Sequence, residues 1–159
     1  MIAEDGAEVL PEGGGEGLRV GDAVLVSWGS GARNVLREKD VDFAILETAR
    51  GGLLRRGLGV ERADAALINN IAKDHLGDFG SRNLDELLGC KWIVSRAVRA
   101  SGKLVLNADD ARLVARSGDY DGEIVWFSLH ADHTIVTAHV AAGGTAAAGS
   151  GTATRGTSG

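Results

Sequence analysis

Short apolar runs alternate with segments of helical periodicity along the middle of the chain, from about residue 20 to about residue 140. Apolar runs of strand length predict strands at 22–28, 41–46, 65–69, 103–106 and 123–127. Helical segments are predicted at 32–38, 51–56, 84–100 and 109–116, and the segment 84–100 is the longest of them. Strands that alternate with helices predict an α/β fold with a mostly parallel sheet flanked by helices.

The two ends of the chain differ in composition from this middle region. Residues 12–17 read EGGGEG, and no aromatic or large aliphatic residue follows Val140. Such segments bury too little apolar surface to offset the entropy lost on ordering. We therefore expect a flexible leader at 1–19, a partial domain at 20–140 and a disordered, low-complexity tail at 141–159.

Composition and charge narrow the class of protein. Hydrophobic residues make up 44% of the chain and charged residues 25%, as in an ordinary globular domain. The formal net charge of −5 argues against a general nucleic-acid surface. No apolar run reaches the ~18 residues of a membrane span, and no secretion leader is recognisable. The single cysteine, Cys90, fits a reducing compartment. We expect a cytoplasmic protein that binds neither nucleic acid nor membrane.

Polar residues follow three of the predicted strands, namely Glu47, the pair Asn69-Asn70, and Asn107. Ligands of open α/β sheets bind beyond the carboxyl ends of the strands. A carboxylate such as Glu47 could bind Mg²⁺ there, and the glycines that follow it, Gly51 and Gly52, would permit close backbone approach to a ligand. The same pattern also suits an ordinary strand-to-helix turn with a solvated glutamate.

Two further positions allow a chemical and a structural interpretation. Asp74-His75 could complete a metal site with Glu47, or Asp74 could cap a short helical turn. On a helical wheel, Lys91 lies inside the apolar arc of the predicted helix 84–100. A buried lysine amine loses its proton more readily and can then react with CO₂ to give a carbamate, which ligates metals. Alternatively, the Lys91 stem covers apolar surface while the amine reaches water.

Asn107-Ala108-Asp109-Asp110 directly follows the predicted strand 103–106. An asparagine amide offers both the donor and the acceptor that an adenine edge requires. Asp109 or Asp110 could instead cap the next helix. The other histidines, His130, His133 and His139, lack metal-binding spacing and are interpreted as surface or packing residues.

Together and in this order, these segments resemble the central, ATP-binding domain of the Mur ligase superfamily, and within it the cyanophycin synthetase family. The resemblance depends on four segments: LETARGGLLRRGL at 46–58, NIAKDHLG at 70–77, the helix that holds Lys91, and VLNADD at 105–110. It implies an ATP-dependent ligase that joins a carboxylate to an amine. A carboxylate attacks the γ-phosphate of ATP, and the amine then displaces phosphate from the resulting acyl phosphate.

The resemblance also implies roles for individual residues. Glu47 and His75 match Mg²⁺-binding residues of the family. Lys91 matches the lysine that many members carbamylate, and Asn107 matches the asparagine that meets adenine. Asn70 and Arg50 are expected to contribute to the nucleotide site. The expected cofactors are thus ATP and Mg²⁺, and the expected partners are small or peptide-like carboxylate and amine substrates.

The sequence departs from the family pattern in several places. The 159 residues contain no G-x-x-x-x-G-K-[ST] phosphate loop. We therefore expect the strand and loop that cradle phosphates in the family, and the domain that follows, to be missing. Asn69 stands where the family usually has Thr, and Lys73 brings a positive charge close to the expected metal ligands. We expect a ligase fragment that is inactive alone. The alternatives are a non-catalytic α/β binding module with relic ligase motifs, or half of a split ligase completed by a chain that carries the phosphate loop.

Overall fold

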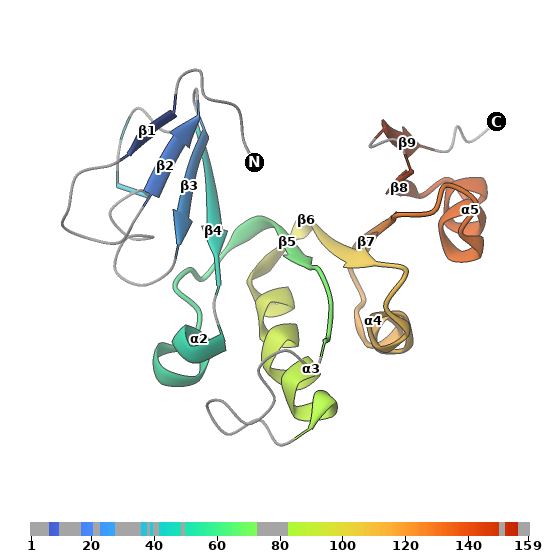
Figure 1. Cartoon of the computed structure of the whole chain (residues 1–159), viewed down its shortest axis with the longest axis horizontal. Coiled ribbons are helices and arrows are strands. Elements are labelled where there is room, and N and C mark those ends of the chain that lie inside the picture. Colours follow the sequence, from blue (N-terminus) through green and yellow to red (C-terminus); the bar gives the residue numbers. More distant parts are fainter. Residues whose placement is uncertain are drawn as a thin grey trace. The chain divides into compact units, whose positions relative to one another are not determined.

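The computed structural model describes residues 7–9, 17–20, 23–27, 36–37, 39, 42–48, 50–72, 83–149 and 152–155 (Figure 1). The chain forms two compact units, Met1–Glu61 and Arg62–Gly159. The expected partial domain over 20–140 stays a prediction, and its range includes the boundary between the two units. The boundary lies in the short segment that connects the helix at 50–56 to the strand at 63–68.

The first unit contains a four-stranded sheet in the order β1-β2-β3-β4. Its strands are β1 (Ala7–Val9), β2 (Gly17–Val20), β3 (Ala23–Ser27) and β4 (Phe43–Glu47), and the helix α2 (Arg50–Arg56) follows. The strands β1, β2 and β3 are antiparallel neighbours, whereas β3 and β4 are parallel. The predicted strands at 22–28 and 41–46 and the helical turn at 51–56 are confirmed. The predicted helix at 32–38 lies largely outside the described residues.

The expectation of a flexible leader at 1–19 is wrong where β1 and β2 form. Val20 pairs with Ala23, so only Gly21 and Asp22 connect β2 to β3. Glycine followed by aspartate is typical of two-residue hairpin loops, because such loops need residues that tolerate positive φ. This dipeptide is the local signal that could have predicted the hairpin.

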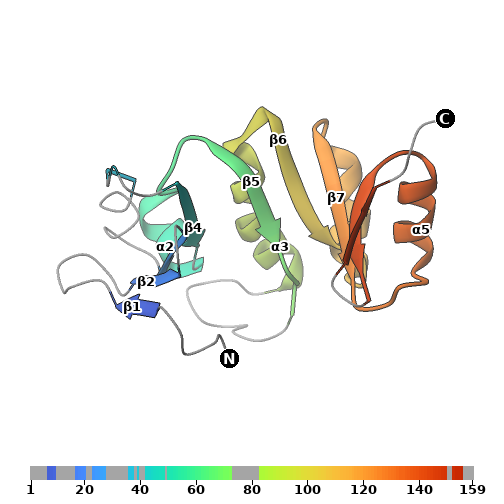
Figure 2. The same cartoon turned by 90° about the horizontal axis from the view of Figure 1, so that it is seen from above.

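The second unit contains a five-stranded sheet in the order β5-β6-β7-β8-β9 (Figure 2). Its strands are β5 (Ala63–Ile68), β6 (Val98–Asn107), β7 (Glu123–Ser128), β8 (Thr145–Ala148) and β9 (Thr152–Arg155). The first four run parallel, and β9 is antiparallel to β8. Three helices, α3 (Leu84–Trp92), α4 (Ala111–Arg116) and α5 (Thr134–Ala141), lie in the successive crossovers. This arrangement confirms the predicted α/β fold with a mostly parallel sheet.

Because the parallel strands follow one another in one direction, right-handed crossovers place their helices on the same face of the sheet. Figure 1 shows α3 and α4 on one side of it. The core lies on that face. A row of buried side chains crosses four strands in register: Ile68, Leu106, Trp126 and Ala146. Leu87 of α3, Leu113 of α4 and Val136 of α5 complete the same cluster.

The predicted helix 84–100 is too long. The α-helix ends at Trp92, a 3₁₀ helix continues to Ala97, and β6 begins at Val98. β-branched residues such as Ile93, Val94 and Val98 disfavour a helix and favour a strand, and β6 gains hydrogen bonds by pairing with β5. Gly102 permits this pairing, since a side chain there would approach the Asp64 backbone oxygen to 2.7 Å. In the described part of the chain, no helix is long and apolar enough to cross a membrane.

The expected disorder of the tail 141–159 is wrong for β8 and β9. Ala146 is fully buried, and the strand that contains it pairs with β7. The tail does not need large apolar residues of its own, because β7 and α5 supply the apolar surface that covers it. Its alanines instead let α5 pack closely against the sheet.

Replacing Ala146 with Asp tests this packing. We expect Ala146→Asp to lower the free energy of unfolding by about 2 kcal/mol or more, because an unpaired polar group would enter the core. Ala147→Asp is the matched control, since Ala147 is only half-buried on the opposite face of β8. Urea unfolding followed by tryptophan fluorescence measures both. If neither substitution changed the free energy of unfolding appreciably, the result would instead indicate a disordered tail.

Candidate functional site

The carboxyl ends of β5, β6 and β7 carry the polar segments Asn69-Asn70, Asn107–Asp110 and Ser128–His130. The strands are parallel neighbours, so these segments lie at one edge of the sheet. Hydrogen bonds then connect them to one another across the sheet.

The Asp110 carboxylate joins the end of β5 to the start of α4. One oxygen, Oδ1, accepts hydrogen bonds from the backbone N–H groups of Arg112 (2.9 Å) and Leu113 (3.2 Å). The other, Oδ2, accepts from the backbone N–H of Ile71 at 2.6 Å. The prediction that Asp109 or Asp110 caps the following helix is therefore confirmed, with Asp110 as the N-cap.

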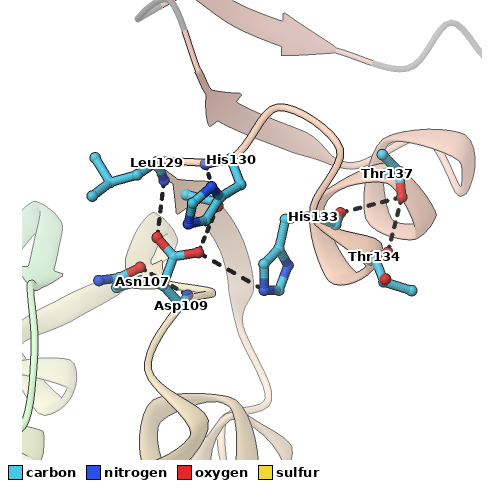
Figure 3. A network of polar contacts seen from close by, with 8 residues as sticks. Asn107, Asp109, Leu129, His130, His133, Thr134 and Thr137 are labelled. Carbon is cyan, nitrogen blue, oxygen red and sulfur yellow. Dashed lines mark hydrogen bonds and ion pairs between the residues drawn. The ribbon is translucent and has the colours of Figure 1, made fainter.

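The Asp109 carboxylate makes the equivalent connection to the end of β7 (Figure 3). Its Oδ1 accepts a 2.6 Å hydrogen bond from the Ser128 hydroxyl, and its Oδ2 accepts a 2.9 Å bond from the Leu129 backbone N–H. The Nε2 atom of His133 lies 3.8 Å from Oδ1. The Ser128 hydroxyl in turn accepts from the backbone N–H of His130 at 2.9 Å.

These contacts favour the charged form of Asp109. The hydrogen bond from Ser128 is the largest cause that lowers the pKa of the Asp109 carboxyl, followed by the bond from Leu129 and by the nearby imidazoles of His130 and His133. Partial burial opposes the shift. At neutral pH the Asp109 carboxyl is thus ionised and accepts these hydrogen bonds as a carboxylate.

Asn107 is the last residue of β6 and comes two residues before Asp109. Its side-chain oxygen accepts a 2.9 Å hydrogen bond from the backbone N–H of Asp109. In Figure 3 the amide nitrogen of Asn107 points away from Asp109. The structure therefore leaves the donor end of this amide directed outward from the loop.

Lys91 and Asn70 are brought together at the end of β5. The Lys91 amine donates a 2.7 Å hydrogen bond to the backbone oxygen of Asn70. The lysine side chain is half-buried, and Asn70 is exposed. Lys91 stands in the last turn of α3, next to the buried Cys90 and Trp92. Its amine is thus fixed near the strand ends, while carbamylation stays a prediction.

The two remaining predicted residues of the described chain belong to the first unit. Glu47 is the exposed last residue of β4, opposite Ser27 of β3, and Arg50 begins α2. An exposed carboxylate at a strand end suits Mg²⁺, which prefers oxygen ligands and keeps several waters. His75 and Asp74 lie outside the described residues. Among the residues that the structure describes, no three His, Cys, Asp or Glu side chains gather as a metal site.

Ser128 and His133 are residues that the sequence did not predict for this site. Ser128 directly follows the apolar run of β7, as Asn107 follows that of β6. A search for polar residues after every predicted strand would therefore have included Ser128. The position of His133, which precedes α5, has no comparable local signal.

Comparison with known proteins agrees with this architecture. The model of the Mur ligase middle domain matches residues 32–150. The chain belongs to this family. It is 38% identical over 136 residues to the cyanophycin synthetase of Trichormus variabilis and 37% identical over 136 residues to that of a Nostoc species. Each of these alignments covers 83% of this chain but only 15% of the relative.

A third relative, the cyanophycin synthetase of Geminocystis herdmanii, is 37% identical over 113 residues, which is 71% of this chain and 13% of the relative. The chain therefore spans a small part of the length of the relatives it matches. The family match extends to residue 150 and so includes β8.

The lowered pKa of Asp109 predicts how stability depends on pH. Its folded pKa lies below the ordinary value of 3.8. The stabilisation is therefore complete well above pH 3.8 and is lost as the pH falls through the folded pKa. We expect Asp109→Asn to be less stable than the native chain by roughly 1 to 3 kcal/mol at pH 7.

The difference in stability between the native chain and Asp109→Asn should narrow progressively below pH 4, because the native Asp109 carboxyl then becomes neutral too. Urea unfolding at a series of pH values measures it. The matched control is Asp121→Asn, since Asp121 is exposed and the structure gives its side chain no hydrogen bond. A difference between native and Asp109→Asn chains that is constant from pH 7 to pH 3 would contradict the assignment.

Proposed function

We propose that this chain is the nucleotide-binding part of a ligase that uses ATP to join a carboxylate to an amine. The proposal rests on membership of the Mur ligase middle-domain family and on similarity to cyanophycin synthetases. The single observation that carries it is the fixed Asn107 amide at the carboxyl end of β6. This is the edge at which open α/β sheets bind ligands.

The proposed reaction has two steps. A substrate carboxylate attacks the γ-phosphorus of ATP, so that an acyl phosphate forms and ADP leaves. The amine then attacks the acyl carbon, phosphate leaves, and loss of a proton from nitrogen gives the amide. Bound Mg²⁺ would supply charge neutralisation at the phosphates. In this proposal Glu47 and His75 hold that ion, and Asn107 meets the base, with Asn70 and Arg50 also contributing to the nucleotide site.

The position of Lys91 is compatible with a carbamate. Addition of CO₂ to the neutral amine leaves one hydrogen on Nζ, and that hydrogen can still donate to the Asn70 oxygen. The hydrogen bond seen at 2.7 Å is therefore compatible with modification at this position. The added carboxylate would supply oxygen ligands of the kind that Mg²⁺ prefers.

We further propose that the chain does not turn over ATP by itself. Its 159 residues contain no phosphate-loop motif, and it spans 15% or less of the length of these cyanophycin synthetases. The substrates would then be held mainly by other parts of a larger ligase, or by a phosphate-loop chain acting in trans.

An ATP-dependent reaction and a single cysteine favour the cytoplasm, with neither nucleic acid nor membrane as a partner.

Nucleotide titration tests the proposal. We expect the chain to bind Mg²⁺-ATP weakly and Asn107→Ala to weaken that binding about tenfold, because a base contact of this kind contributes roughly 1.4 kcal/mol. Asp121→Ala, at an exposed position away from the site, should bind as the native chain does. Chemical-shift titration measures these affinities.

A parallel assay for ADP release should detect no turnover. Turnover that Glu47→Ala abolishes would contradict the proposed inactivity of the chain. Equal binding by the native chain and Asn107→Ala would contradict the nucleotide site and favour a relic binding module.

A further inference from the structure

The loop between β6 and α4 is held from two sides. On one side the Asp110 carboxylate accepts from the Ile71 N–H at the end of β5. On the other, the Asp109 carboxylate accepts from Ser128 and Leu129 at the end of β7. A loop joined to both neighbouring strands has little freedom to move.

The hydrogen bonds on the two sides of this loop fix the position of a backbone group that faces Asn107. The N–H of Asp109 donates to the Asn107 side-chain oxygen at 2.9 Å. An asparagine amide can rotate, and rotation would exchange its donor and acceptor ends. Because this N–H belongs to a loop with little freedom to move, its bond to the Asn107 oxygen opposes the rotation, and the amide nitrogen points outward as Figure 3 shows.

The carboxylate of Asp109 is well suited to this task. It lies between two donors and close to the His133 imidazole, and its side chain is 23% exposed. The donors also keep it ionised, since they lower the pKa of its carboxyl. Charge-assisted hydrogen bonds of this kind are stronger than neutral ones, so the anchor does not depend on one contact.

We propose that Asp109 and Ser128 are positioning residues for base recognition: they lock the Asn107 amide with its N–H₂ group outward, ready to donate to a ring nitrogen of the base. Neither residue touches the nucleotide. The inference rests on the proposed function, because it assumes that Asn107 meets the base. Locking the amide before binding removes an entropy cost that a free side chain would incur on binding.

Two readouts separate the positioning role from a general structural one. The first is the mobility of the Asn107 side-chain amide, followed by ¹⁵N relaxation without nucleotide. We expect a rigid amide in the native chain and a mobile one in Asp109→Ala. Ser128→Ala should have a smaller effect, because the Leu129 bond to Asp109 remains. Ser128→Thr should restore the native behaviour, since it keeps the hydroxyl.

The second readout is a double-mutant cycle on the binding of Mg²⁺-ATP and of inorganic tripolyphosphate. Asp109→Ala should weaken ATP binding by at least about threefold, but not when Asn107 is already alanine. Tripolyphosphate, which has no base, should bind equally to all variants. Ser117→Ala is the matched serine control, since the Ser117 hydroxyl donates to Val114 within the α4 region.

Each outcome bears on a distinct claim. An unchanged, rigid Asn107 amide in Asp109→Ala would overturn the positioning role, whatever the affinities are. The positioning role would also be overturned if Asp109→Ala weakened ATP binding by the same factor in the native chain and in Asn107→Ala, even with a mobile Asn107 amide. If the amide loosens but the native chain binds ATP no better than tripolyphosphate, the proposed function fails, and the role in base recognition fails with it.

Discussion

Two neighbouring carboxylates, Asp109 and Asp110, connect three strand ends of the second unit. Where strands leave a sheet, their backbone N–H groups lose the partners that the ladder provided. Asp110 accepts from such a group on Ile71, and Asp109 accepts from one on Leu129. Asp109 and Asp110 follow each other in the same turn, and they thus accept hydrogen bonds from the strands on opposite sides of β6. The start of α4 and the orientation of Asn107 both depend on these bonds.

The core and the site are coupled through strand alternation. Leu106 belongs to the buried row that faces the helices, so Asn107, the next residue, belongs to the opposite face. The same alternation puts Trp126 in the core and Phe127 beside Asn107 in the register. A slip of one residue in β6 would exchange the core leucine and the site asparagine. Packing of Ile68, Leu106 and Trp126 therefore fixes where the amide is presented.

Much of this could be predicted from sequence, because apolar runs such as 103–106 and 123–127 mark buried parallel strands. Local patterns also predicted a helix cap at Asp109 or Asp110. The length of the helix could not be read from a wheel, since the end of α3 depends on the pairing of Val98 with Ala63 of β5. The bond between Asp109 and Ser128 joins residues 19 apart, and only the folded sheet brings them together. For Glu47 and His75, the family resemblance remains the basis of the expected metal roles.

Amide hydrogen exchange at Ile71 and Leu129 tests the central claim most directly. If the two carboxylates hold the strand ends, both amides exchange slowly in the native chain. Asp110→Ala should then accelerate exchange at Ile71 but not at Leu129, and Asp109→Ala should accelerate it at Leu129 but not at Ile71. The amide of Leu106, at the centre of the sheet, should stay protected throughout and so exclude general unfolding. Fast exchange of Ile71 and Leu129 in the native chain, or rates unchanged by the substitutions, would contradict the account.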